Sequence, residues 1–128
     1  MKKLLTFLVT ASVVVSAYAG DFADISVKEV NKLAESKSAV IIDVNGDDSF
    51  KAGHVPGALN FAGIKDNFVL SLPKKKDALI VAYCGNPKCG AYLKAAKAAE
   101  KLGYTNIKHM SAGISGWKAA GMKTEPGS

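Results

Sequence analysis

The stretch Tyr83-Cys84-Gly85-Asn86-Pro87-Lys88-Cys89-Gly90 directly follows the apolar run Ala78-Leu79-Ile80-Val81-Ala82. The apolar run is short, uncharged and rich in β-forming residues, which predicts a fully buried strand of a parallel sheet. Residues 91–102 are rich in Ala, Leu and Lys and predict a helix. Cys84 therefore lies in a strand-to-helix turn. In an open α/β sheet such a turn is at the carboxyl edge, where ligands bind, and at the positive end of a helix dipole.

The rest of the chain alternates between strand-like and helix-like segments. Ser26 and Glu29 form a capping box, which predicts a helix that ends near Ser36. A poorly marked helix is expected over 64–72 and a last helix over 112–120, before an extended, partly frayed tail at 121–128. The remaining strands are expected at 22–25, 39–44, 59–61 and 106–110. This alternation predicts a single α/β domain with a mainly parallel sheet.

Residues 1–19 have the pattern of a secretory signal peptide. Lys2 and Lys3 give a positive start, residues 4–15 an apolar region, and Ala17-Tyr18-Ala19 a cleavage signal. A membrane anchor is the alternative, but the apolar region is too short to span a bilayer comfortably, and no second hydrophobic segment follows. We therefore expect a mature domain at 20–128 that is exported to the periplasm and has no membrane attachment after cleavage.

The charge of the chain argues against nucleic acid as a partner. The formal net charge of +6 falls to +4 without Lys2 and Lys3, and every basic residue is a lysine. The run Lys74-Lys75-Lys76 is too short to indicate a nucleic-acid site. A mildly positive field would still concentrate small anions near the protein.

The two cysteines of the chain, Cys84 and Cys89, lie in the same loop. The periplasm is oxidising, so a disulfide is the first possibility for an exported chain. A bridge between these positions closes so short a loop that the chain-entropy model gives it only about 2 kcal/mol. The pair would be a weak structural staple, which favours a chemical role.

Four motifs in the same order resemble the rhodanese-like domain. They are Ile42-Asp43-Val44 with Gly53-His54-Val55-Pro56-Gly57-Ala58, the strand that ends in Tyr83-Cys84, Gly103-Tyr104-Thr105-Asn106-Ile107, and Gly113-Ile114-Ser115-Gly116-Trp117. The resemblance runs from about residue 25 to about residue 122. It implies an open parallel sheet of about five strands flanked by helices on both faces. More narrowly, the chain looks like the single-domain exported rhodaneses with a second cysteine in the active loop.

The resemblance also implies a chemistry. Cys84 would take a sulfane sulfur from a donor such as thiosulfate, hold it as a persulfide and pass it to a thiophilic acceptor. The partners would be a small anionic donor and the acceptor, with a protein thiol as a possible partner. No cofactor and no metal are required.

The residues of the loop agree with this chemistry. A thiolate is the nucleophile, and the pKa of a thiol, about 8.5 when free, falls to roughly 3.5–7.5 at a helix N-terminus or beside a cation. Lys88 is the cation that the loop supplies, as a point charge. Candidates for an anion cradle that binds the substrate are the backbone N–H groups of Gly85, Asn86, Lys88, Cys89 and Gly90.

Two positions depart from the pattern of the family. Asn45 stands where the family usually has an arginine, so the usual ion pair cannot form there. Cys89 stands where many members have an arginine that binds the anionic donor, so the identity of the donor is open. Related phosphatases and arsenate reductases close a longer loop with an arginine. This chain has no arginine, which argues against phosphatase chemistry.

Cys89 has three possible roles at this point. It could act as a resolving thiol that attacks a Cys84 persulfide and releases sulfur, it could protect Cys84 from overoxidation, or it could be a passive substitute. Two other functions are also open: a non-catalytic sulfur carrier, and a thiol-disulfide redox protein. The C-x₄-C spacing differs from the C-x-x-C of thioredoxins, which ranks the redox protein lower.

Other polar and aromatic residues have simpler interpretations. His54 and His109 with the two cysteines match no compact zinc site, although His109 could face the mouth of the site. Trp117 is expected in the core or in a pocket wall. Asp43 is expected to cap a turn or to hold the active loop.

Overall fold

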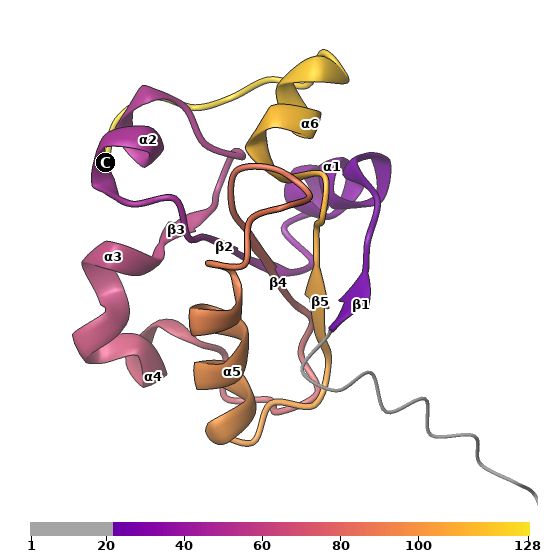
Figure 1. Ribbon diagram of the computed structural model, residues 1–128. Helices are drawn as coiled ribbons and strands as arrows, with labels where there is room; N and C mark the ends of the chain where they lie inside the picture. Colours follow the sequence, from indigo (N-terminus) through magenta and orange to yellow (C-terminus); the bar gives the residue numbers. More distant parts are fainter. Residues whose placement is uncertain (1–21) are drawn as a thin grey trace, which may run out of the picture.

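Five parallel strands form the centre of the computed structural model, which describes residues 22–128 (Figure 1). They lie in the order β1-β5-β4-β2-β3, and every neighbouring pair is parallel. Their bounds are β1 Ala23–Asp24, β2 Val40–Asp43, β3 Leu59–Asn60, β4 Ile80–Tyr83 and β5 Ile107–His109. The predicted fold class is confirmed. The signal peptide expected at 1–19 lies outside the described residues and stays a prediction.

The central strand β4 is buried at every position, as its unbroken apolar run predicts. Its side chains alternate between two cores, since successive residues of a strand point to opposite faces. Ile80 and Ala82 belong to the same apolar cluster as Cys84. Val81 and Tyr83 belong to a second cluster on the other face. The alternation therefore assigns Cys84 to one particular face of the sheet.

Helices cover both faces. The face of Cys84 is packed by α3 (Phe61–Ile64), α4 (Phe68–Ser71) and α5 (Leu93–Lys101). The opposite face is packed by α1 (Val27–Ser36), α2 (Asp47–Ala52) and α6 (Gly113–Ala119). Figure 1 shows the loop after β4 passing between α5 and α6. No helix among residues 22–128 is long and apolar enough to cross a membrane.

The helix boundaries differ from the predicted ones at two places. α5 begins at Leu93, two residues later than expected, because the N–H groups of Leu93 and Lys94 donate to carbonyls only three residues back. In place of one helix over 64–72, the structure has the last residue of α3, the 3₁₀ turn η1 (Lys65–Asn67) and α4. The break lies at Asn67, a poor helix former, whose backbone leaves the helical region with φ −123° and ψ 30°.

The C-terminal tail is held to the domain rather than frayed. Glu125 and His54 exchange two backbone hydrogen bonds of 2.8 and 2.9 Å as an isolated antiparallel bridge. The N–H of Gly127 donates to the carbonyl of Lys51 at 2.9 Å. The tail therefore supports the turn at 53–58, and this segment also contacts the end of β4.

Candidate functional site

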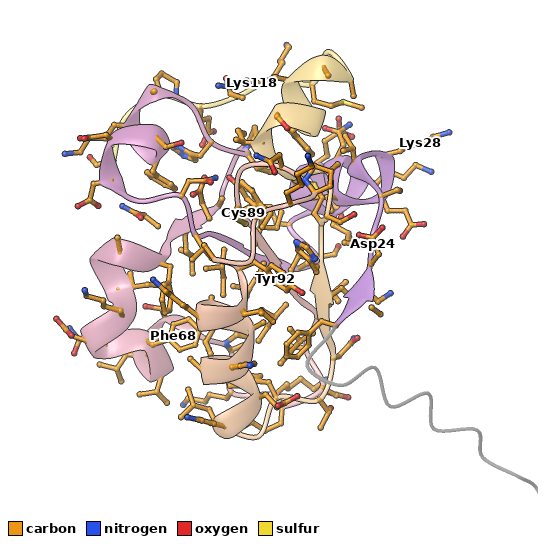
Figure 2. The ribbon with its side chains drawn as sticks, viewed as in Figure 1. Asp24, Lys28, Phe68, Cys89, Tyr92 and Lys118 are labelled. Atoms are coloured by element: carbon orange, nitrogen blue, oxygen red, sulfur yellow. A yellow bond between two sulfur atoms is a disulfide. The ribbon has the colours of Figure 1, made fainter. Side chains whose placement is uncertain are left out.

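Cys84 directly follows β4 and is 1% exposed. It is joined to Cys89 by a disulfide, with the two Cα atoms 6.3 Å apart, inside the usual range for a bridge. Cys89 is half-buried and packs against the same apolar cluster. Figure 2 shows Cys89 on the loop above Tyr92, which lies just before α5. The structure thus brings together the two sulfur atoms that the sequence placed in one loop.

Asn86 organises the tip of this loop. Its side-chain Oδ1 accepts the N–H of Lys88 at 2.9 Å, and its carbonyl accepts the N–H of Cys89 at 3.0 Å. Two of the five N–H groups predicted to cradle an anion therefore donate within the loop in this disulfide form. Lys88 itself is exposed at the tip, and Gly85 and Gly90 flank the turn. The substrate-binding role of these residues stays a prediction.

The first turn of α6 fixes the base of the loop. The N–H of Ile114 donates to the carbonyl of Cys84 at 2.9 Å, and the N–H of Ser115 donates to the carbonyl of Gly85 at 3.0 Å. Gly113 has φ +65°, and a Cβ there would lie 2.5 Å from the carbonyl carbon of Gly85. Only glycine satisfies both the backbone angle and this close approach.

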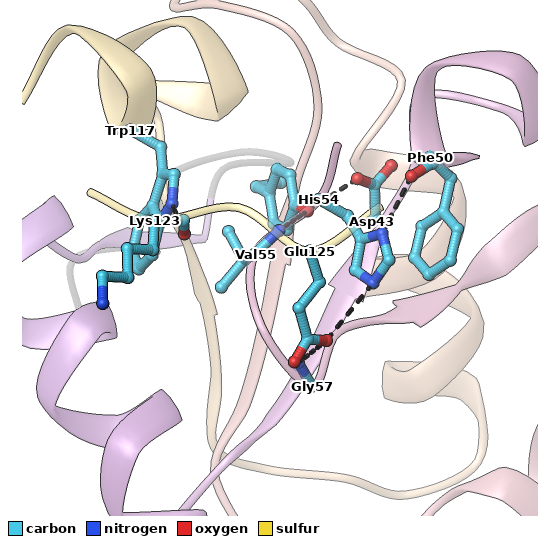
Figure 3. Close-up of polar contacts among 9 residues, drawn as sticks. Asp43, Phe50, His54, Val55, Gly57, Trp117, Lys123 and Glu125 are labelled. Carbon is cyan, nitrogen blue, oxygen red and sulfur yellow. Dashed lines mark hydrogen bonds and ion pairs between the residues drawn. The ribbon is translucent and has the colours of Figure 1, made fainter. Parts of the chain in front are cut away.

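A buried hydrogen-bond network holds the residue before Cys84. The hydroxyl of Tyr83 donates to Oδ2 of Asp43 at 2.6 Å and accepts the N–H of Val55 at 3.0 Å (Figure 3). The other carboxylate oxygen of Asp43 accepts the N–H of Asn45 at 2.8 Å. Asp43 and Tyr83 are fully buried. Asp43 thus caps a turn and holds the loop through Tyr83, as expected, because the two side chains lie in register on β2 and β4.

Burial is the main cause that raises the pKa of the Tyr83 phenol far above its usual range, and the neighbouring Asp43 carboxylate raises it further. Tyr83 therefore stays protonated in the folded protein, as a donor to Asp43. An ionised phenolate in the same place would be buried beside a carboxylate, which is unfavourable.

His54 has a structural environment. Its ring stacks on Phe50 with centroids 3.6 Å apart, and Nδ1 lies 2.8 Å from the carbonyl oxygen of Phe50. Its Nε2 lies 3.7 Å from a carboxylate oxygen of Glu125 in the tail (Figure 3). The same Glu125 oxygen accepts the N–H of Gly57 at 3.2 Å. His54 thus links the turn at 53–58 to the tail.

His109 and Trp117 are also buried. The ring of His109 stacks on Tyr92 with centroids 3.3 Å apart, at the end of β5 beside the start of α5. Trp117 lies in the core of the opposite face, and its Nε1–H donates to the carbonyl of Lys123 at 2.8 Å (Figure 3). Among residues 22–128, no three His, Cys, Asp or Glu side chains are grouped closely enough to hold a metal ion.

Asn45, which departs from the family pattern, lies against the active loop. Its Oδ1 is 3.6 Å from the position that a Cβ on Gly85 would take. Its Nδ2 is buried, and the described residues offer it no hydrogen-bond acceptor. The position therefore contributes packing at the base of the loop in place of an ion pair.

Comparison with known proteins agrees with this geometry. A family model described as "Rhodanese-like domain" matches residues 26–120. The chain belongs to this family. It is 31% identical over 101 residues to the thiosulfate sulfurtransferase GlpE of Pseudoalteromonas translucida, covering 77% of this chain and 91% of GlpE.

Two further relatives give the range of the resemblance. The uncharacterized protein YibN of Escherichia coli is 30% identical over 92 residues, which are 70% of this chain and 62% of YibN. The solved structure of the human single-domain sulfurtransferase TSTD1 has a TM-score of 0.60 and 27% identity, covering 75% of this chain and 95% of that one. This chain thus spans less than two thirds of YibN but nearly the whole of GlpE and of TSTD1. Rhodanese-type sulfur transfer is the chemistry of the family to which the chain belongs.

Sequence reasoning missed three features that fix the loop. The hydroxyl of Tyr83, the close approach of Gly113 and the bridge to Glu125 all join residues far apart in the sequence. Gly113 lies in a motif that the resemblance includes, but its close approach to the loop appears only in the folded chain. Nothing in the sequence around Glu125 indicates that the tail returns to His54.

Replacement of Tyr83 by Phe tests the buried network. The change leaves an oxygen of Asp43 and the N–H of Val55 without their buried partner, so we expect the free energy of unfolding to fall by roughly 1–3 kcal/mol at pH 8. Urea unfolding measures this free energy of unfolding. The control is Tyr104→Phe, which also loses a hydroxyl, one that donates to the carbonyl of Pro73. That bond involves no carboxylate, so we expect a smaller loss.

The stability of the wild-type protein and that of Tyr83→Phe should also depend differently on pH. The pKa of Tyr83 is higher in the folded protein than its unfolded value of about 10, so its stabilising contribution is complete below pH 10 and declines above it. The wild-type protein should therefore lose its advantage over Tyr83→Phe by up to about 1.4 kcal/mol per pH unit above pH 10. Parallel stability profiles between pH 8 and 11 would contradict the assignment.

Replacement of Gly113 by Ala tests the contact between α6 and the loop. We expect a loss larger than the roughly 1–2 kcal/mol that a left-handed backbone costs an ordinary residue, because the added Cβ also meets the loop backbone. The matched control is Gly121→Ala, at φ +75° with no atom within 4 Å of the added Cβ. Denaturation midpoints of the two variants separate contact from backbone strain, and equal losses would exclude the contact.

Proposed function

We propose that this protein is a rhodanese-type sulfurtransferase that moves sulfane sulfur from a donor such as thiosulfate to a thiophilic acceptor through a persulfide of Cys84. The observation that carries the proposal is the position of Cys84. It follows the central strand at the carboxyl edge of a parallel sheet, within a domain of the rhodanese-like family. This edge is where open α/β sheets bind their ligands.

The proposed reaction needs no oxidant. The Cys84 thiolate attacks the outer sulfur of thiosulfate, a sulfur-sulfur bond forms, and sulfite leaves. An acceptor such as cyanide then attacks the outer sulfur of the persulfide, and Cys84 leaves as a thiolate. The same residue is nucleophile in the first step and leaving group in the second, so a low thiol pKa helps only up to the point at which nucleophilicity falls.

Cys89 acts as a resolving thiol in this proposal. Attack of the Cys89 thiol on Sγ of the Cys84 persulfide would form the disulfide and release the outer sulfur as hydrogen sulfide ion. The short loop keeps the two sulfur atoms in bonding range. A disulfide blocks the nucleophile, so a protein in this form must be reduced by a thiol before it can turn over.

The location of the reaction is also a proposal. The pattern of residues 1–19 supports export to the periplasm, where oxidising conditions favour the disulfide form.

A thiol-disulfide redox protein is the second candidate, and the pairing of Cys84 with Cys89 is the observation that favours it. Sulfur turnover separates the two functions, because a redox protein cycles its disulfide without carrying sulfur. A carrier without turnover would hold one sulfur and need a partner to discharge it.

Intact mass after loading is the direct test. The reduced Cys89→Ser variant, treated with thiosulfate and desalted, should gain the mass of one sulfur atom, and cyanide should discharge it as thiocyanate. The reduced protein with both cysteines should instead release hydrogen sulfide and form the disulfide. Cys84→Ser should gain none. Cys89→Ser is the matched variant: it retains the nucleophile and lacks the disulfide, so it should load without prior reduction.

The outcomes distinguish the candidate functions. Sulfur loading that survives in Cys84→Ser would exclude Cys84 as the nucleophile. A reversible disulfide in the protein with both cysteines, with no sulfur gain in Cys89→Ser and no release of hydrogen sulfide in the presence of thiosulfate or of a persulfide donor, would identify a redox protein instead.

Lys88→Ala tests the loop cation. Lys88 is exposed at the loop tip, so we expect the KM for thiosulfate to rise roughly 2–5-fold, the size expected of one exposed charge pair, and to rise less at high salt. The KM for an uncharged organic trisulfide should not change. Lys101→Ala, at the far end of α5, is the control with the same loss of charge. An equal rise for both donors would exclude an electrostatic role.

A further inference from the structure

We propose that the thiol which reduces the disulfide between Cys84 and Cys89 attacks Sγ of Cys89, so that Cys84 is released first, as a thiolate. The choice of sulfur atom follows from the different surroundings of the two cysteines in the disulfide form. The role of this attack as the step that restores the nucleophile rests on the proposed sulfurtransferase function.

Cys84 is the protected sulfur atom of the pair. It is 1% exposed and lies in an apolar cluster with buried residues of β2, β4 and α5. A reductant that attacked Cys84 would have to reach a sulfur atom that the core already surrounds. The carbonyl oxygen of Cys89 also lies 3.3 Å from Sγ of Cys84, and its partial negative charge disfavours an anionic attacker there.

The backbone at the Cys84 end of the loop is closed as well. The carbonyls of Cys84 and Gly85 accept the N–H groups of Ile114 and Ser115. A Cβ on Gly113 would lie 2.7 Å from the carbonyl oxygen of Cys84, so this end of the loop has no room even for a methyl group.

The Cys89 end of the loop is open. Cys89 is half-buried, and its neighbours Lys88 and Gly90 are exposed. A Cβ on Gly90 would meet no atom within 4 Å, so there is free space beside Cys89. Lys88 adds a positive charge next to this space, which favours the approach of a thiolate. The same disulfide therefore has one accessible and one inaccessible sulfur atom.

The step balances with a thiol as the reductant. Its thiolate attacks Sγ of Cys89, the bond between the two protein sulfur atoms breaks, and Cys84 leaves as a thiolate. Cys89 then carries a mixed disulfide, which a second molecule of the thiol cleaves to free Cys89 and the disulfide of the reductant. Two thiols thus supply the two electrons that reduce the protein disulfide. Cys84 is free after the first attack, before Cys89 is released.

Sulfite identifies the sulfur atom that is attacked. Like a thiolate, it cleaves a disulfide by attack on one sulfur atom, and it remains there as an S-sulfonate. The protein, fully oxidised to the disulfide form, is treated briefly with sulfite and quenched with acid, and the freed thiol is alkylated. Trypsin then separates the two cysteines, because Lys88 precedes Cys89 directly: Cys84 is recovered in peptide 77–88 and Cys89 in peptide 89–94.

We expect at least about ten times more S-sulfonate on Cys89 than on Cys84 in the folded protein, because access decides which sulfur atom reacts. The control is the same protein unfolded in urea, where both sulfur atoms are exposed and the two yields should agree within about twofold. Equal yields or a preference for Cys84 in the folded protein would overturn the inference. So would a folded protein that forms no S-sulfonate when the sample in urea does, because Cys89 would then be inaccessible.

Gly90→Val tests the open side of Cys89 directly. The backbone of Gly90 is outside the left-handed region, so it can accept a valine. We expect the rate of disulfide reduction by 2-mercaptoethanol to fall roughly 3–10-fold, because the added side chain fills the space beside Cys89. The matched control is Gly63→Val on α3, where a Cβ would meet only the side chain of Asn60 within 4 Å. It should leave the rate unchanged. An unchanged rate in Gly90→Val, or an equal fall in both variants, would contradict attack from this side.

The experiments separate failure of the inference from failure of the proposed function. Sulfite reports on the disulfide whether or not the protein carries sulfur. Sulfur loading of Cys89→Ser by thiosulfate, with no preference of sulfite for Cys89 in the wild-type protein, would refute the inference alone. A preference for Cys89 without sulfur loading would refute the proposed function and would leave the attack on Cys89 as the reduction step of a redox protein.

Discussion

The structure depends most on the contact between the first turn of α6 and the backbone of the active loop. Ile114 and Ser115 donate their N–H groups to the carbonyls of Cys84 and Gly85, which a buried loop would otherwise leave without partners. The bonds can form only because Gly113 has no side chain where the two segments meet. A helix from the C-terminal end of the chain therefore fixes the conformation of the nucleophile's loop.

The other support of Cys84 comes from the strand before it. Because residues alternate across a strand, placing Tyr83 on the face of α1 and α6 places Cys84 on the face of α3 and α5. The hydrogen bond from Tyr83 to Asp43 fixes the orientation of Tyr83 and therefore also that of Cys84. The buried hydrogen bond between Tyr83 and Asp43 in one core thereby directs Sγ of Cys84 to the core on the opposite face of the sheet. This gives the buried carboxylate of Asp43 a positioning role, in addition to its turn cap.

The sequence predicted those parts of the fold in which local pattern and tertiary packing agree. The apolar run before Cys84, the capping box at Ser26 and the turn signals gave the strands, the first helix and the fold class, and Ser26 indeed accepts the N–H of Glu29. It failed where weak helix formers leave the outcome to packing, as at Asn67. It could not foresee that the tail returns to His54, because a bridge through backbone groups leaves no signature in side chains. The pairing of Cys84 with Cys89 was a possibility that only three-dimensional proximity could resolve.

The absence of arginine shapes how a site of this kind can select its substrates. An arginine presents a rigid fork that recognises a planar or tetrahedral oxyanion by geometry, whereas a lysine offers a mobile point charge. A chain with lysines alone attracts anions of many shapes to the carboxyl edge of the sheet, so charge by itself separates donor from acceptor poorly. On the proposed function, discrimination must come from what surrounds each cation. Lys88 stands on an exposed loop tip, whereas Lys65 and Lys94 border a cavity with apolar walls, so cations of one kind have different surroundings.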